Sequence, residues 1–299
     1  MNMTRKVATL GSLSSLSLAL FLSYSLIQTP AVFGQAPQGG GAPKGGVAKA
    51  PDPRVQQRTY HFADTNEELP YALFVSSKVT KNKKAPLIVA LHGVFGDGNS
   101  LLRGNALDLA EEGGYILVGP MGYNPQGWFG SPVIVMNGGP GKGKGPGAAK
   151  GGPPPTPEPA NLAELSEKDV MNVLAIMRKE FNVDDKRTYL MGHSMGGAGA
   201  LFLGPKYVDQ WAAVASMAPA AFLMQPESLA PVKDKMPLFL AHGDADTVVP
   251  IDIGRRWAKT ATDLKMKDFK YMELPGADHG TVITQSMPEI FKFFKDHTR

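Results

Sequence analysis

The chain has 299 residues, of which 43% are hydrophobic and 19% charged, and its formal net charge at pH 7 is +4. This is the composition of a globular protein large enough for one sizeable α/β domain, and the small net charge argues against a nucleic-acid partner. The sequence contains no cysteine, which excludes disulfides, thiolate metal sites and a lipid-modified cysteine.

Residues 1–34 have the pattern of a secretory signal peptide. Arg5 and Lys6 precede an uncharged stretch, residues 7–27, that is rich in leucine and serine. Cleavage is expected after Gly34, with Ala36 as the other acceptable position. The pattern therefore predicts a secreted or periplasmic protein. If the segment remains uncleaved, it is long enough to serve as a membrane anchor, and only then do we expect a membrane contact.

A flexible linker is predicted for residues 35–57, which are rich in proline, glycine and alanine. The folded domain is expected over residues 58–299. It begins with two apolar segments, residues 59–62 and 70–75, which flank a polar turn and predict an antiparallel hairpin. Residues 86–91 form a continuous apolar run, as in a strand buried on both faces of a sheet.

Alternating strands and helices are predicted for the rest of the chain. The exception is a Gly/Pro-rich insertion at about residues 137–160, which is expected to be disordered because added loop length costs little free energy. The expected helices are at about 100–112, 162–181, 197–203, 254–264 and 287–294, and the later strands are at 115–118, 188–191, 212–218, 238–241 and 269–274. This order predicts an α/β fold with a mostly parallel sheet, an N-terminal antiparallel hairpin and helices on both faces. Reactive loops then belong at the carboxyl ends of the strands.

The segment Gly192-His193-Ser194-Met195-Gly196 joins an apolar strand to a helix start rich in small residues. A serine hydroxyl is a weak nucleophile at its free pKa, so it needs a turn that exposes the oxygen and brings backbone N–H donors to the attacked carbonyl. A GxSxG sequence in this position predicts a nucleophile elbow for acyl transfer.

The serine requires a base, for which His279 is the candidate because it follows the last predicted strand at the same sheet edge as Ser194. A carboxylate must orient that base. The segment after the strand 238–241 offers Asp244 and Asp246, and their spacing leaves both open. Asp278 adjoins His279 too closely to face its ring. The other five histidines are interpreted as surface groups (His61, His297), hydrogen-bonded turn residues (His92, His242) or a neighbour pointing away from the serine (His193).

The order Ser, Asp, His along the chain is that of the α/β-hydrolases. The segments 91–93, 192–197, 242–250 and 278–279 resemble the motifs of secreted α/β-hydrolases, in particular dienelactone-hydrolase-like and poly(3-hydroxybutyrate)-depolymerase- or feruloyl-esterase-like serine esterases. The resemblance implies the α/β-hydrolase fold and assigns the carboxylate to Asp246. It also implies an oxyanion hole made by the backbone N–H groups of Met195 and Val94, with Phe95 as the alternative to Val94.

These residues predict a secreted serine esterase that acts on a small ester or a polymer ester through an acyl-enzyme. Trp128 and Phe129 are expected to contact the substrate, since they lie in the loop after the strand 115–118. No cofactor or metal is expected, because the sequence has no HExxH or paired-histidine motif. Two alternatives are an exported prolyl-oligopeptidase-like serine peptidase and a catalytically inactive binding protein of the same fold. The sequence does not indicate the oligomeric state.

Overall fold

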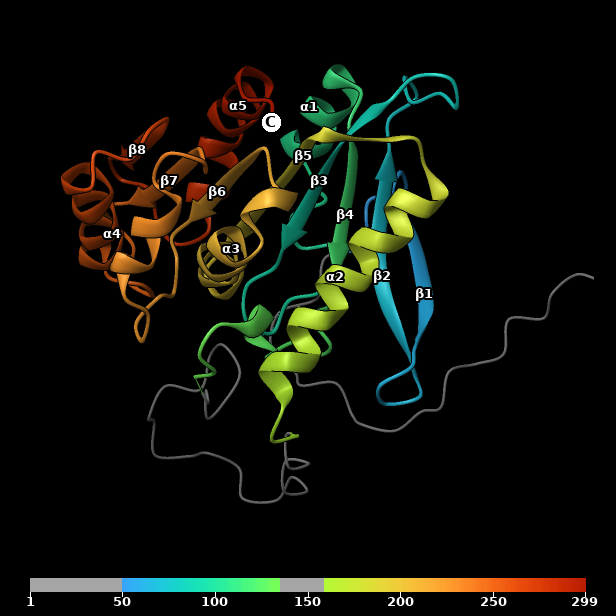
Figure 1. Cartoon of the computed structure of the whole chain (residues 1–299), viewed down its shortest axis with the longest axis horizontal. Helices are drawn as coiled ribbons and strands as arrows, with labels where there is room; N and C mark the ends of the chain where they lie inside the picture. Colours follow the sequence, from blue (N-terminus) through green and yellow to red (C-terminus); the bar gives the residue numbers. More distant parts are fainter. Residues whose placement is uncertain (1–49, 135–158) are drawn as a thin grey trace, which may run out of the picture. The chain divides into compact units, whose positions relative to one another are not determined.

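An eight-stranded sheet forms the centre of the part that the computed structural model describes, residues 50–134 and 159–299 (Figure 1). The predicted signal peptide, the first part of the linker and nearly all of the predicted insertion lie outside the described residues. The strands are β1 (Gln56–Phe62), β2 (Glu67–Val75), β3 (Ala85–Leu91), β4 (Ile116–Pro120), β5 (Val183–His193), β6 (Ala213–Met217), β7 (Leu238–Gly243) and β8 (Phe269–Leu274).

The strand order is β1-β2-β4-β3-β5-β6-β7-β8. β1 pairs antiparallel with β2, and β2 pairs antiparallel with β4. All other neighbours in the sheet are parallel. The predicted mostly parallel sheet with an N-terminal antiparallel hairpin is therefore confirmed. The apolar run of β3 lies near the middle of this order, where every one of its residues is buried.

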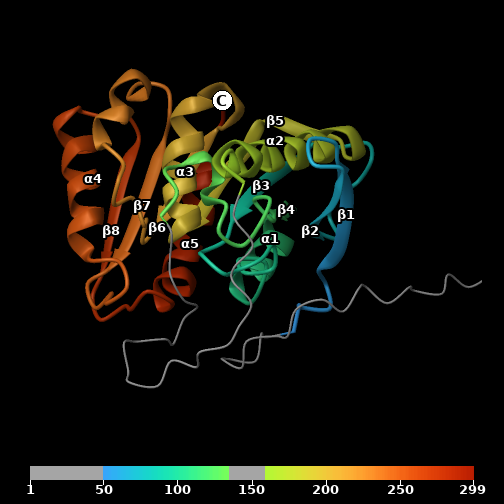
Figure 2. The same ribbon diagram turned by 90° about the horizontal axis from the view of Figure 1, so that it is seen from below.

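Helices cover both faces of the sheet, as the sequence predicts (Figure 2). They are α1 (Asn105–Gly113), α2 (Leu162–Glu180), α3 (Met195–Lys206), α4 (Ile251–Asp263) and α5 (Thr281–Asp296). Side chains of β3 alternate between two hydrophobic clusters: Leu87, Val89 and Leu91 pack with α2, α3 and α4, whereas Ile88 and Ala90 pack with α1 and α5. The sheet thus separates two cores, one on each side.

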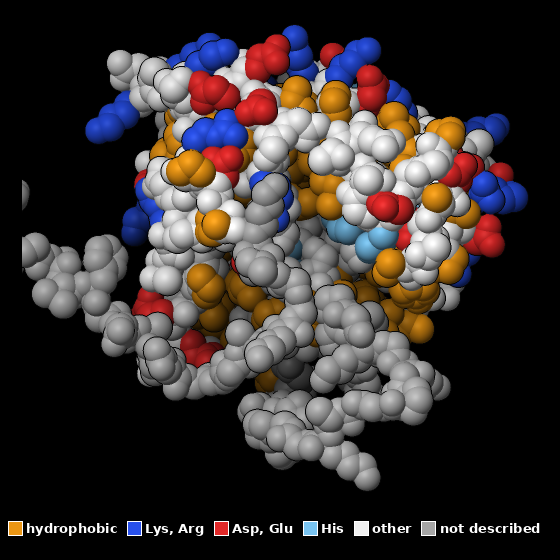
Figure 3. Space-filling model, turned by 180° about the vertical axis from the view of Figure 1, so that it is seen from behind, with side chains coloured by type: hydrophobic (Ala, Val, Ile, Leu, Met, Phe, Trp, Pro, Cys, Tyr) orange, Lys and Arg blue, Asp and Glu red, His pale blue; other side chains and the backbone are white. Residues whose placement is uncertain are grey.

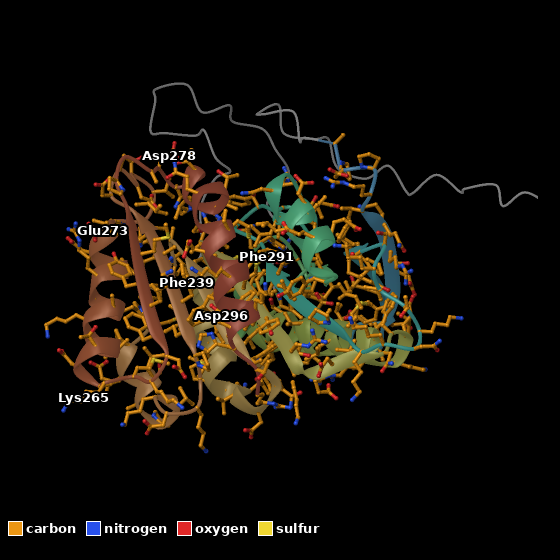
Figure 4. All side chains as sticks on the ribbon, turned by 90° about the horizontal axis from the view of Figure 1, so that it is seen from above. Phe239, Lys265, Glu273, Asp278, Phe291 and Asp296 are labelled. Atoms are coloured by element: carbon orange, nitrogen blue, oxygen red, sulfur yellow. The ribbon has the colours of Figure 1, made fainter. Side chains whose placement is uncertain are left out.

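The C-terminal helix α5 lies against the second of these cores. Phe239 of β7 and Phe291 of α5 are both buried there, between the sheet and the helix (Figure 4). The ring of Phe294 stacks on that of Tyr189 in β5, with centroids 4.7 Å apart. Within the described residues, no helix is long and apolar enough to cross a membrane.

Two predicted helix starts are misplaced. The segment 100–104 is not helical, and α1 begins at Asn105. The reason is a turn in which Asp97 Oδ1 accepts the Asn99 N–H and Ser100 Oγ accepts the Asp97 N–H. Conversely, α5 begins at Thr281, six residues before the predicted start. The Asp278 carboxylate accepts the N–H groups of Gly280 and Thr281 and so satisfies donors that the helix start leaves free.

Backbone strain gathers at one edge of the sheet. Several residues other than glycine have positive φ, and most of them follow the carboxyl ends of β3, β4, β5 and β6: Phe95, Tyr123, Trp128, Phe129, Ser194 and Ala218. Such conformations cost free energy and persist only where surrounding contacts hold them, as at active sites. The positive φ values therefore indicate a functional site at this edge of the sheet.

Candidate active site

Ser194 occupies a tight turn between β5 and α3, with φ 58° and ψ −116°. A Cβ atom on Gly192 would lie 2.0 Å from the Gly196 carbonyl oxygen, and one on Gly196 would lie 2.1 Å from that of Leu91. Only glycine fits at these two positions. The strained turn is held by the Ser194 N–H, which donates to the Met217 carbonyl at 3.0 Å. This is the geometry of a nucleophile elbow.

The three predicted residues meet at this turn. Ser194 Oγ lies 2.9 Å from His279 Nε2, and His279 Nδ1 lies 2.7 Å from Asp246 Oδ2. An ionised carboxylate only accepts, so Nδ1 carries the ring proton and Nε2 is free to accept the Ser194 hydroxyl proton. Asp244, which spacing had left open, is elsewhere: its Oδ1 accepts the Gly276 N–H at 2.6 Å and fixes the loop that precedes His279.

The Asp246 carboxylate is buried and held by several donors. Its Oδ1 accepts the N–H groups of Val248 at 2.8 Å and Val249 at 2.9 Å, and its Oδ2 faces His279. Burial by itself raises the pKa of this carboxyl, but the hydrogen bonds from His279, Val249 and Val248 outweigh burial and hold the pKa below its usual value. Asp246 is therefore an anion at neutral pH.

His193 fixes the backbone of His279. Its Nε2–H donates to the His279 carbonyl oxygen at 2.7 Å, and the centroids of the two rings lie 4.6 Å apart. Burial, reinforced by the proximity of His279, lowers the pKa of His193 to about 3. The prediction that His193 points away from Ser194 overlooked this contact, because a sequence does not show which loop crosses above the elbow.

Two backbone N–H groups are available near the serine. Met195 is the first residue of α3, where an N–H has no helical acceptor. The loop after β3 runs beside the elbow, since a Cβ atom on Gly93 would lie 3.4 Å from Ser194 Cβ. The Phe95 N–H donates to the Pro125 carbonyl at 2.9 Å, whereas that of Val94 has no acceptor within the described ranges. This favours Val94 over Phe95 as the second predicted oxyanion donor.

Trp128 and Phe129 are buried, with 2% and 0% of their surfaces exposed. Phe129 packs beneath the site. Its ring lies edge-on to that of His92, with centroids 5.2 Å apart, and its N–H donates to Ser166 Oγ at 2.9 Å. The Trp128 Nε1–H has no partner in the part of the chain described. Both side chains belong to the core beneath the site. Their contact with a substrate stays a prediction.

One residue that sequence reasoning missed supports this edge of the sheet. Asp169 of α2 is fully buried and accepts the N–H groups of Gly122 at 2.6 Å and Tyr123 at 3.1 Å, together with the Tyr60 hydroxyl at 2.5 Å. Burial raises the pKa of Asp169. The signal was available: Asp169 lies on the same buried face of the helix as Leu165 and Val173, where a charged residue requires a partner.

Within the described residues, no group of three or more histidine, aspartate or glutamate side chains is placed to hold a metal ion. The contacts between Ser194, His279 and Asp246 can support nucleophilic chemistry. The site contains a hydroxyl on a strained turn, an imidazole that can accept its proton, and a buried anion behind the imidazole.

Comparison with known proteins gives a matching family and matching folds. The family model described as putative esterase matches residues 170–278. Acyl-protein thioesterase 1 of Emericella nidulans is 32% identical over 113 residues, which are 36% of this chain and 46% of that protein. A putative esterase, NocK, of Nocardia uniformis subsp. tsuyamanensis is 26% identical over 170 residues, 56% of this chain and 42% of that protein. The chain thus spans less than half the length of these curated relatives.

Solved structures share the fold over most of the chain. The ferulic acid esterase of the anaerobic fungus Anaeromyces mucronatus superposes with a TM-score of 0.60 at 18% identity, covering 86% of this chain and 96% of that one. A thermostable esterase superposes with a TM-score of 0.59 at 23% identity, covering 82% of this chain and 64% of that one. The α/β-hydrolase fold and the resemblance to esterases are therefore confirmed.

Acid should destabilise the fold in part through His193. Its pKa is about 3 in the folded protein and about 6.5 when unfolded. Below pH 6.5 the unfolded state thus takes up a proton that folded His193 refuses, and the free energy of unfolding falls with falling pH. We expect His193→Gln, which keeps an N–H donor but does not titrate, to lose less stability between pH 6.5 and 4.5, by on the order of 2 kcal/mol.

Urea unfolding of both proteins at several pH values measures this difference. Asp169 and the other histidines contribute equally to the wild type and the variant, so the comparison isolates His193. An equal loss of stability in the two proteins would contradict a neutral buried His193.

Proposed function

We propose that the protein is a serine carboxylic-ester hydrolase that works through an acyl-enzyme. The observation that carries the proposal is the continuous chain of contacts from Ser194 Oγ through the His279 ring to Asp246. Ser194 attacks the ester carbonyl while His279 Nε2 accepts the hydroxyl proton, and His279 then returns that proton to the departing alcohol. Water repeats the sequence on the acyl-enzyme and releases the acid.

Asp246 keeps the Nδ1 proton on His279 and stabilises the imidazolium that forms during attack. The N–H groups of Met195 and Val94 stabilise the tetrahedral oxyanion, and a donor in this role contributes ~3 kcal/mol. Support for an ester substrate comes from the matching family and from relatives named as esterase and thioesterase. A small ester substrate is compatible with all of these names.

The acyl group of the substrate is proposed to be apolar. Three large hydrophobic side chains of the described residues are notably exposed: Phe222 at 41%, Leu223 at 61% and Val248 at 57%. All three lie in loops after β6 and β7, next to the elbow: the Ala220 N–H donates to the Ser194 carbonyl, and the Val248 N–H donates to Asp246. Figure 3 shows histidine side chains that reach the surface beside hydrophobic ones. Burial of an acyl chain there removes apolar surface from water.

Serine-dependent hydrolysis tests the proposal. Wild type should hydrolyse p-nitrophenyl esters, and Ser194→Ala should reduce kcat by at least about 10³-fold because the nucleophile is lost. Ser286→Ala is the matched control, since Ser286 is a buried serine of α5 whose hydroxyl bonds within its own helix. A folded wild-type protein without activity on any of these esters would overturn the esterase proposal.

The apolar acyl group predicts a chain-length preference that depends on Leu223. Leu223→Asn should lower kcat/KM for the octanoyl ester about fivefold to tenfold relative to the acetyl ester, because each buried CH₂ contributes about 0.8 kcal/mol. Lys83→Asn, at an exposed position in the loop between β2 and β3, is the control and should leave the ratio unchanged. A ratio that is equal in wild type and Leu223→Asn would contradict the assignment of this surface.

We also propose that the protein is exported. Arg5, Lys6 and the uncharged stretch 7–27 support this proposal. Expression of the full chain in a secreting bacterial host should give an extracytoplasmic protein whose N-terminus, read by mass spectrometry, is Gln35 or Pro37. Recovery of the chain from the cytoplasm with its first residues intact would contradict export.

A further inference from the structure

A second buried imidazole lies against the Asp246 carboxylate. His242, at the end of β7, has a fully buried side chain, and its Nε2 lies 3.4 Å from Asp246 Oδ2. The same nitrogen lies 2.9 Å from the Val249 carbonyl oxygen. The proposed mechanism gives this side chain no part in proton transfer, because Ser194 reaches only His279.

The contacts fix the proton of His242. A carbonyl oxygen and an ionised carboxylate both only accept, so Nε2 carries the hydrogen and donates to Val249, with its edge toward Asp246. The other nitrogen, Nδ1, has no hydrogen-bond partner among the described residues. It faces α4, where a Cβ atom on Gly254 would lie 2.4 Å from it. A second proton at Nδ1 would be buried and unpaired.

His242 is accordingly neutral beside an anion. Burial lowers its pKa, against the opposing effects of the Val249 hydrogen bond and the Asp246 charge. The other titratable groups that act on it are His279, Glu273 of β8 and, from the elbow, His193. A neutral ring presents a fixed N–H dipole to Asp246 without adding a positive charge that would compete with a protonated His279.

We propose that His242 is a positioning residue for the Asp246–His279 pair, through two effects. Its ring fills the space beside Oδ2 and holds that oxygen toward His279, and its N–H dipole moderates the negative potential that His279 experiences. Gly254 contributes to the same positioning, because α4 can approach the His242 ring only if residue 254 has no Cβ atom. The inference rests on the proposed esterase function and concerns a residue that does not touch the substrate.

The decisive experiment compares His242→Gln with His242→Leu. Glutamine places an amide N–H where Nε2 lies, whereas leucine fills the site without a donor. For His242→Leu we expect kcat to fall about tenfold with KM within twofold of wild type, the scale of losing an outer hydrogen-bond partner. Without the dipole, Asp246 favours protonated His279 more strongly, so the acid limb of kcat/KM should move to higher pH. His242→Gln should retain the wild-type kcat and the wild-type position of the acid limb of kcat/KM.

Gly254→Ala provides an independent test that leaves His242 in place. Alanine favours the helix, so the protein should remain folded, which urea unfolding checks. The new Cβ displaces the ring, and kcat should again fall about tenfold. In a His242→Ala background the same change should cost nothing further, because the two residues act through one contact. His61→Gln, an exposed histidine of β1, is the control for the pH profile.

The outcomes separate this inference from the proposed function. Inactive wild type overturns the esterase proposal itself. Active wild type with an unchanged acid limb in His242→Leu, or with additive effects of Gly254→Ala and His242→Ala, overturns the positioning role.

Discussion

Burial of the Asp246 carboxylate costs free energy, and the hydrogen bonds around it offset that cost. Two come from the backbone of the residues that follow it, Val248 and Val249, and one comes from His279. The first two are local and form when the loop after β7 closes on itself. The third requires a loop more than thirty residues later to fold over the sheet edge. The carboxylate therefore reaches its full stabilisation only when the complete domain is assembled.

The elbow is the second constraint, and it acts on the backbone. Ser194 is held at positive φ because β5 and α3 are joined without spare residues, and the glycines at 192 and 196 let the neighbouring chains approach. The loops after β3 and β6 then pack on this turn: Gly93 lies beside Ser194, and the Ala220 N–H bonds to the Ser194 carbonyl. Three strand ends are thus tied to one residue, so the position of its hydroxyl depends on the loops after β3, β5 and β6 together.

Local patterns were sufficient for the sheet, the elbow and the proximity of Ser194 and His279, because a buried run such as β3 and a GxSxG turn are fixed by their own residues. Spacing left Asp244 and Asp246 both open, and only the resemblance to known hydrolases pointed to Asp246. The helix starts were harder to predict. The turn at Asp97 delays α1, and the carboxylate of Asp278 begins α5 earlier than its apolar period indicates. The position of Asp169 on the buried face of its helix was a signal in the sequence, but its partners, Tyr60 and the loop after β4, are distant in sequence and could not be predicted.

Burial determines the charge of the histidines that surround His279 at this edge of the sheet. His92, His193 and His242 are buried, and burial lowers the pKa of each. The neutral rings of His193 and His242 each donate one hydrogen bond to a carbonyl oxygen and hold loops without adding charge. In the proposed mechanism, a second imidazolium near His279 would oppose the one that forms when Ser194 attacks, because like charges at short range repel strongly in a buried site. Keeping the surrounding rings neutral therefore reserves the Asp246 charge for His279.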